Sequence, residues 1–152
     1  MPDVFISYST KDEELAQFVR QHLEAQKLSV FIASLSLVAG ERWTPKIISE
    51  LKGSQWVVLL ATKDALASAS VQMEAGAAIF GEKKVVPIMW NVKPEEVPRW
   101  ISDYQGILLS DSTMEHLATQ VSQLAAKIKA NKDTGLLVVL AILAGLFIAG
   151  RQ

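Results

Sequence analysis

Apolar residues in this chain alternate between short continuous runs and segments with helical spacing. The segments between the runs place apolar residues three or four positions apart, which is typical of helices packed on a sheet. The short continuous runs themselves are typical of parallel strands that are buried on both faces. The pattern predicts an α/β fold with a doubly wound, five-stranded parallel sheet in the flavodoxin-like order. The expected strands cover residues 4–8, 28–32, 55–61, 84–90 and 106–109.

Local signals predict where several helices begin and which face of the last one is buried. Thr10–Glu13 and Ser112–Glu115 have capping-box spacing, and Thr44–Pro45 has an N-cap followed by a first-turn proline. Pro87 within the fourth run indicates an edge strand or a bulge, because proline cannot donate to a sheet ladder. The buried stripe of the final helix is expected to contain Met114, Leu117, Val121, Leu124 and Ile128.

One carboxylate is prominent in the segment after the third run. Residues 71–80 are almost all apolar or small, and Glu74 is their single charged member. At helical spacing Glu74 has small neighbours, among them Ser70, Ala77 and Gly81. Ligands of open parallel sheets bind outside the carboxyl ends of the strands, so Glu74 would face a crevice between the first and third strands. The alternative is an ordinary, partly exposed helix glutamate.

Composition excludes several classes of function. The chain has 152 residues, a net charge of −1 and a pI near 6.1, so it carries no basic footprint for nucleic acid. It has no cysteine, which excludes disulfides, thiolate catalysis and cysteine-based metal sites. No metal-ligand spacing, P-loop or GxGxxG motif is present, and His22 and His116 stand isolated on expected helices. We therefore expect no metal.

The end of the chain differs from the rest. Gly135–Gly150 contains no polar residue, and as a helix it would span about 24 Å of a hydrocarbon core about 30 Å thick. We predict a single-pass membrane anchor in residues 131–152, after a domain in residues 1–130; the alternative is a buried or oligomer-packed helix. More cations precede the apolar run than follow it, which places the domain on the cytoplasmic side of the cell membrane. These cations are Lys127, Lys129 and Lys132, against Arg151.

Three short motifs together resemble the TIR (Toll/interleukin-1 receptor) domain family. They are Phe5–Ser9 after the start, Gly40–Trp43 before a helix, and Ser70–Glu74. Their order and spacing agree with the family over residues 3–130, and the bacterial branch is closer than the animal receptors. The resemblance implies the TIR version of the flavodoxin-like fold.

The resemblance also implies a reaction and a site. Catalytic members of the family cleave NAD+ between nicotinamide and ribose, and their essential glutamate corresponds to Glu74. NAD+ is then the substrate, and no further cofactor is expected. The loop Ala33 to Trp43 corresponds to the BB loop, which gates the site and mediates self-association. Residues expected beside the dinucleotide are Tyr8, Ser9, Arg42, Trp43 and Ser70.

Two positions depart from the family pattern. Many members have tryptophan at Ser70 and aspartate at Ala33. The sequence thus predicts a membrane-anchored NAD+-cleaving TIR domain, by hydrolysis or cyclisation, in bacterial defence or signalling. One alternative is a non-catalytic scaffold that recruits partners through its BB loop. Another is an effector that disrupts membranes with its C-terminal helix when the TIR domains assemble.

Overall fold

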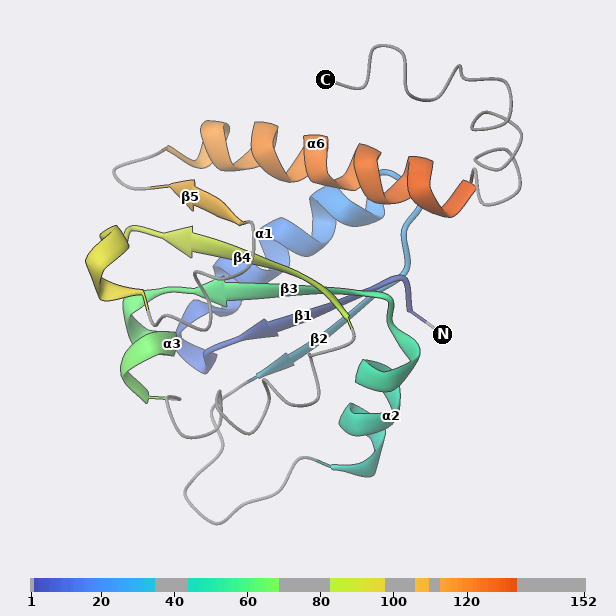
Figure 1. Ribbon diagram of the computed structural model, residues 1–152, viewed down its shortest axis with the longest axis horizontal. Helices are drawn as coiled ribbons and strands as arrows, with labels where there is room; N and C mark the ends of the chain where they lie inside the picture. Colours follow the sequence, from blue (N-terminus) through green and yellow to red (C-terminus); the bar gives the residue numbers. More distant parts are fainter. Residues whose placement is uncertain (1, 35–43, 69–82, 98–105, 110–112, 134–152) are drawn as a thin grey trace.

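The computed structural model describes residues 2–34, 44–68, 83–97, 106–109 and 113–133 (Figure 1). Strands and helices alternate along the chain, as the sequence predicts. The strands are β1 (Val4–Tyr8), β2 (Val30–Ser34), β3 (Trp56–Ala61), β4 (Lys84–Trp90) and β5 (Ile107–Leu109). The helices are α1 (Glu13–Glu24), α2 (Pro45–Gly53), α3 (Lys63–Ser68) and α6 (Met114–Asp133), with short 3-10 turns η1 (Thr10–Asp12) and η2 (Pro94–Glu96).

In the described part of the chain, the strands form a five-stranded sheet in the order β2-β1-β3-β4-β5. Every neighbouring pair is parallel, with Ile6 opposite both Ile32 and Val58. This confirms the flavodoxin-like order and its switch point between β1 and β3. β2 begins at Val30, two residues later than the apolar run suggested, because Val30 is the partner of Val4 at the start of β1.

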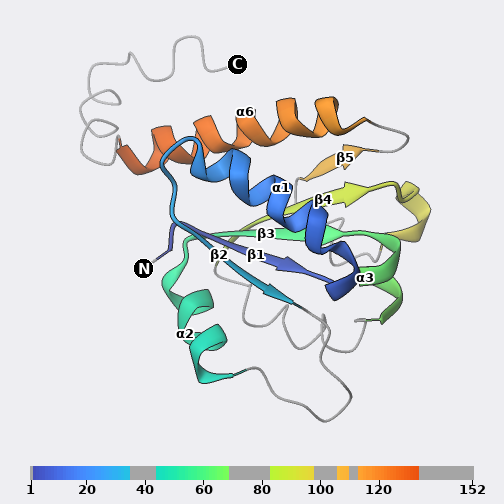
Figure 2. The ribbon, with the colours of Figure 1, turned by 180° about the vertical axis from the view of Figure 1, so that it is seen from behind.

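Helices cover both faces of the sheet (Figures 1 and 2). α1 and α6 lie on one face and α2 on the other. Side chains of β1 alternate between them: Ile6 and Tyr8 belong to the larger core under α1 and α6, and Phe5 belongs to a smaller core with Leu51 of α2. Because both faces are covered, β1 and β3 are buried along their whole length. This is why their sequences show no polar alternation.

The structure confirms one helix start and corrects two. The Ile47 N–H donates to Thr44 Oγ1 at 3.2 Å, as the N-cap prediction requires. α1 begins only at Glu13, after η1, so Thr10 is not its N-cap. α6 begins at Met114, and the His116 N–H donates to Thr113 Oγ1 at 3.1 Å. The hydroxyl that caps α6 therefore comes from Thr113, and Ser112, the expected cap, lies outside the described residues.

Two further expectations are wrong. β4 lies between β3 and β5 and pairs with β3 without a break in register, so Pro87 is on neither an edge strand nor a bulge. The proline is tolerated because β5 pairs with β4 only from Ile88 onward. Gly106 precedes β5 at this point, and a Cβ there would stand 2.4 Å from the Pro87 carbonyl oxygen. Met114, expected in the buried stripe of α6, is 44% exposed, whereas Leu117 and Val121 are buried.

The predicted anchor, Gly135–Gly150, lies outside the described residues, as does most of the BB loop. α6 continues to Asp133, three residues past the boundary that the sequence suggested. Among the residues that the structure describes, no helix combines the length and apolarity needed to cross a bilayer. The anchor and the domain boundary stay predictions.

Candidate active site

Two of the predicted site residues lie at the carboxyl end of β1. Tyr8 is the last residue of the strand and Ser9 follows it, and both are buried. β3 is the neighbour of β1 in the sheet, so this is the switch point at which ligands of such sheets bind. Glu74, Ser70, Arg42 and Trp43 lie outside the described residues, and their roles stay predictions.

Ser9 forms the turn between β1 and α1. Its carbonyl accepts the Asp12 N–H at 2.8 Å, and its hydroxyl accepts the Lys11 N–H at 3.4 Å. The two bonds fold the chain into η1 and set the position at which α1 begins. Ser9 therefore shapes the rim of the crevice through its backbone and side chain together.

Tyr8 is held by a carboxylate of α1. Its hydroxyl donates to Glu13 Oε2 at 2.5 Å, and its ring lies in the core under α1 and α6. Burial, the hydrogen bond to Glu13 and the charge of Glu13 together raise the pKa of Tyr8 to about 12. The phenol stays protonated at neutral pH and joins the end of β1 to the start of α1.

A second bond, which sequence reasoning missed, joins α1 to β3. Thr62 follows β3, and its hydroxyl donates to Asp12 Oδ2 at 2.5 Å. Thr62 Oγ1 also accepts the Ala65 N–H at 3.1 Å, so Thr62 caps α3. Burial raises the pKa of Asp12; the Thr62 bond lowers it, the charge of Asp64 raises it further, and the net shift is upward. The available sequence signal was a threonine directly after an expected strand, which is a common place for an N-cap.

Ser7 was also missed. It is fully buried near the carboxyl end of β1, with Ala33 and Leu59 beside it in the sheet register. Strand alternation puts it on the face of Phe5, toward α2. Among the described residues, its hydroxyl has no hydrogen-bond partner. Such a group costs about 1–3 kcal/mol when it is left unpaired, and it is the exception on an otherwise apolar face of the sheet.

On the α1 side, the same end of the sheet carries a cavity of about 610 Å³. Its rim is rich in carboxylates, and Phe18 and Trp90 form its apolar wall. Carboxylates repel phosphate groups and favour positive charge. This cavity is therefore suited to a cationic group and not to a diphosphate. The acidic residues of its rim are Asp12, Glu13 and Glu14.

Fold and site together define an open α/β domain with buried polar side chains, Ser7, Tyr8 and Ser9, at its topological switch point. Residues 4–125 match the protein family described as TIR domain, and this chain belongs to that family. The chain is similar to "NAD(+) hydrolase SARM1" of Danio rerio, with 33% identity over 99 residues that cover 59% of this chain. It spans only 14% of the length of that protein.

Solved structures with the same fold include three TIR proteins. A metazoan TIR-STING receptor from C. gigas, in complex with 2′,3′-cGAMP, has a TM-score of 0.63 and 20% identity, covering 82% of this chain and 39% of that one. The TIR domain of the receptor TRR-2 from Hydra magnipapillata has a TM-score of 0.59 and 16% identity, covering 85% and 99%. The RPS4 and RRS1 TIR domain heterodimer has a TM-score of 0.61 and 8% identity, covering 83% and 96%. These likenesses show the fold.

Proposed function

We propose that this chain cleaves NAD+ at the bond between nicotinamide and ribose, with Glu74 as the catalytic carboxylate. The observation that carries the proposal is the sheet order, which puts β3 beside β1 at the switch point. The segment that contains Glu74 continues from α3 directly after β3. Membership of the TIR family and similarity to a protein named as an NAD(+) hydrolase support the same reaction.

The chemistry needs one well-placed negative charge. Nicotinamide is a pyridinium in NAD+ and leaves as a neutral molecule, so no general acid has to protonate it. The ribose becomes oxocarbenium-like, as in glycoside hydrolysis. Glu74 would stabilise that cation electrostatically and hold the ribose hydroxyls. Water then attacks to give ADP-ribose and a proton, or the adenine of the substrate attacks to give a cyclic product.

The described residues would contribute by fixing the frame of the site. The bonds from Tyr8 to Glu13 and from Thr62 to Asp12 lock the start of α1 to the ends of β1 and β3. Because the α1 side is acidic, we place the diphosphate on the other face, toward Ser7 and Ser9. Arg42 would be its cationic partner there, with Trp43 and Ser70 beside the dinucleotide.

The test follows nicotinamide release by the full chain in detergent. Glu74→Gln keeps the size of the side chain but removes its charge, and a loss on the order of a hundredfold is expected. Glu115→Gln, an exposed glutamate in the first turn of α6, is the matched control and should leave the rate unchanged. A folded Glu74→Gln protein with the parental rate would refute the assignment.

We further propose that the enzyme is membrane-anchored and works in bacterial defence or signalling, activated by self-association through the loop Ala33 to Trp43. The support is the apolar sequence of that loop and of Gly135–Gly150. Anchoring in one plane raises the effective concentration of the domains. Activity per molecule should rise with surface density in liposomes, and Leu37→Asp should flatten this rise. Equal activity of isolated monomers would contradict it.

The replacement of the usual tryptophan by Ser70 favours a second candidate, a non-catalytic scaffold. A scaffold would release no nicotinamide at any surface density but would still self-associate through the BB loop. A membrane-disrupting effector would instead release dye from vesicles, and Glu74→Gln would not change that release. The three assays together separate the three functions.

A further inference from the structure

The amino ends of the strands carry a cluster of lysines from distant parts of the chain. Lys52 lies in the last turn of α2, Lys83 precedes β4 and Lys84 begins it, and Lys127 and Lys132 lie in the second half of α6. Helices of a parallel α/β domain run against the strands, so their carboxyl ends meet the amino ends of the strands. Figure 1 shows the end of α6 and the amino terminus at the same end of the sheet, opposite the arrowheads of the strands. We call these five lysines the basic end.

One contact joins two members of the basic end, and another places a third over an aromatic ring. Lys83 Nζ donates to the Lys52 carbonyl at 2.6 Å. Lys84 Nζ lies 5.0 Å from the ring centroid of Trp56. Lys83, Lys84 and Lys127 line a cavity of about 450 Å³, together with Gln120 and Gln123. The cavity thus combines three cations and two amide groups, the chemistry that accepts a phosphate ester, with an apolar wall that includes Val86 and Leu124.

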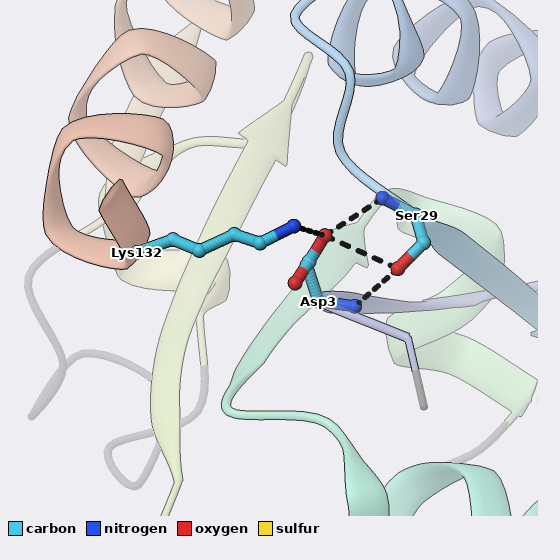
Figure 3. A network of polar contacts seen from close by, with 3 residues as sticks. All are labelled: Asp3, Ser29 and Lys132. Carbon is cyan, nitrogen blue, oxygen red and sulfur yellow. Dashed lines mark hydrogen bonds and ion pairs between the residues drawn. The ribbon is translucent and has the colours of Figure 1, made fainter.

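Carboxylates neutralise only part of the basic end. Lys132 is paired, because its Nζ lies 3.1 Å from Asp3 Oδ2 (Figure 3). Glu24, near the end of α1, pairs with Arg20. Within the part of the chain that the structure describes, Lys83, Lys84 and Lys127 form no ion pair. The basic end therefore presents uncompensated positive charge.

The position of the apolar run after α6 indicates which kind of partner the basic end would bind. α6 ends at Asp133, and the bond from Lys132 to Asp3 fixes this end beside the first residues of β1. The apolar run Gly135–Gly150 begins directly afterwards. If this run enters a bilayer, as proposed above, the basic end is brought against the lipid surface. Lysines near an anionic membrane each add about 1 kcal/mol of attraction.

We infer that the basic end is a membrane-facing surface that binds anionic lipid headgroups, with the headgroup phosphate in the cavity of Lys83, Lys84 and Lys127. This inference rests on the proposed anchor. It sets the orientation of the domain: the carboxyl ends of the strands, and with them the NAD+ crevice, point away from the bilayer. A strand of five residues spans about 17 Å, so the crevice opens into the aqueous phase.

The first experiment uses the full chain in vesicles of phosphatidylcholine, with or without phosphatidylserine. Amine-reactive labelling followed by mass spectrometry reports the access of each lysine. Lys83, Lys84 and Lys127 should react several-fold more slowly in the anionic vesicles, and high salt should remove this protection. Lys11 and Lys63, at the opposite end of the sheet, are internal controls and should not change. Equal labelling in both vesicles, or protection of Lys11, would overturn the inference.

The second experiment measures affinity with a weakened anchor, the full chain carrying Leu143→Arg. Preference for anionic over neutral vesicles should fall about fivefold for each lysine removed, and roughly a hundredfold for the triple Lys83→Gln, Lys84→Gln, Lys127→Gln variant. The matched triple variant Lys11→Gln, Lys63→Gln, Lys93→Gln should keep the preference. An unchanged preference in the first triple variant would refute the lipid surface.

Further measurements distinguish a failure of this inference from a failure of the proposed anchor or of the proposed activity. If the parental chain fails to enter neutral vesicles, the anchor has failed, whereas loss of the anionic preference alone reports on the basic end. NAD+ cleavage in detergent should be unchanged in the Lys83→Gln, Lys84→Gln, Lys127→Gln variant, because these lysines lie at the opposite end of the sheet from the crevice. If an inositol phosphate in detergent protects Lys83, Lys84 and Lys127 as well as anionic vesicles do, the ligand is a soluble phosphate and the membrane surface is excluded.

Discussion

The two ends of the sheet hold aspartates in opposite electrostatic settings. At the amino end, Asp3 Oδ2 accepts the Ser29 N–H at 2.9 Å, the Ser29 hydroxyl at 3.1 Å and Lys132 Nζ at 3.1 Å. Partial burial raises the pKa of Asp3, but these donors outweigh it and hold the pKa below 3.8. At the carboxyl end, burial and Asp64 raise the pKa of Asp12 above 3.8 against the single bond from Thr62.

The difference agrees with the two proposals, a membrane-binding surface at the amino end and a catalytic site at the carboxyl end. The amino end has more lysines than acids, so its carboxylate is neutralised and cations are left to face outward. The carboxyl end gathers Asp12, Glu13 and Glu14, and its pair of Lys11 and Asp64 is long, at 3.9 Å, and exposed. Uncompensated carboxylates beside a ligand crevice suit a reaction in which positive charge develops on the substrate.

The largest effect is expected from a substitution that tests whether the amino end of the sheet faces a membrane. Leu143→Arg puts a charge in the middle of the apolar run, which costs about 2.5–3.5 kcal/mol on insertion. The carbonate-resistant membrane fraction should fall sharply, while Leu143→Phe should leave it unchanged. A parental chain that is soluble and monodisperse without detergent would refute the predicted membrane anchor.

The next effect concerns the carboxyl end. Thr62→Val removes the donor to Asp12 and the cap of α3, and Thr62 is buried, so water cannot replace either bond. The free energy of unfolding of the full chain in detergent should fall by about 1–3 kcal/mol. Thr119→Val is the control, because the exposed Thr119 hydroxyl bonds only to a carbonyl of its own helix. A change within about 0.5 kcal/mol for both variants would show that the bond is not structural.

At the amino end, Asp3→Asn should lower the free energy of unfolding by about 1.5 kcal/mol at neutral pH, because it removes a charge that accepts three hydrogen bonds. Since the pKa of Asp3 is lowered on folding, its stabilisation is present above pH 3.8 and is lost as pH falls through the folded pKa. Urea unfolding of both proteins at several pH values tests this. The two curves should converge in acid, and a pH-independent gap would contradict the ion pair.

Tyr8→Phe should cost about 1 kcal/mol, because Glu13 loses its donor. Spectroscopic titration gives a sharper readout, since the chain has only two tyrosines. One phenol should ionise at about 12 in the parental protein, and this step should be missing in the variant. Between pH 10 and that value, ionisation of the unfolded phenol should lower the stability of the parental protein. Two phenols ionising together at the ordinary pKa would refute the bond.

The smallest effect has the opposite sign. Asp12→Asn keeps an acceptor for Thr62 but removes a carboxylate whose pKa is raised on folding. The variant should be more stable at neutral pH by less than about 1 kcal/mol, because solvent partly screens the charge. The gain should shrink as pH falls and vanish below 3.8, where Asp12 is protonated in both states. A loss of stability at neutral pH would show that the charge of Asp12 is favourable.

The sequence by itself determined the α/β class, the sheet order and the cap of α2. Continuous apolar runs such as Trp56–Ala61 record burial on both faces, and Thr44 bonds a donor only three residues away. Both signals are local or periodic, so they can be read before the chain folds. The same locality explains why the predicted starts of α1 and α6 are wrong. Thr10 and Ser112 have capping-box spacing, but Asp12 and Thr113 are the residues directly before the first helical residue.

Only the tertiary structure decided how the charges of the two ends are arranged. Thr62 and Asp12 are 50 residues apart, and Lys132 and Asp3 are 129 apart, yet each pair shares a hydrogen bond. No local pattern predicts such a bond, because it exists only after the crossovers have brought β1, β3 and α6 together. Of the candidate site, Tyr8 and Ser9 could be placed from sequence, whereas Ser7, Asp12 and Thr62 could not. Their roles depend on burial and on partners that the fold supplies.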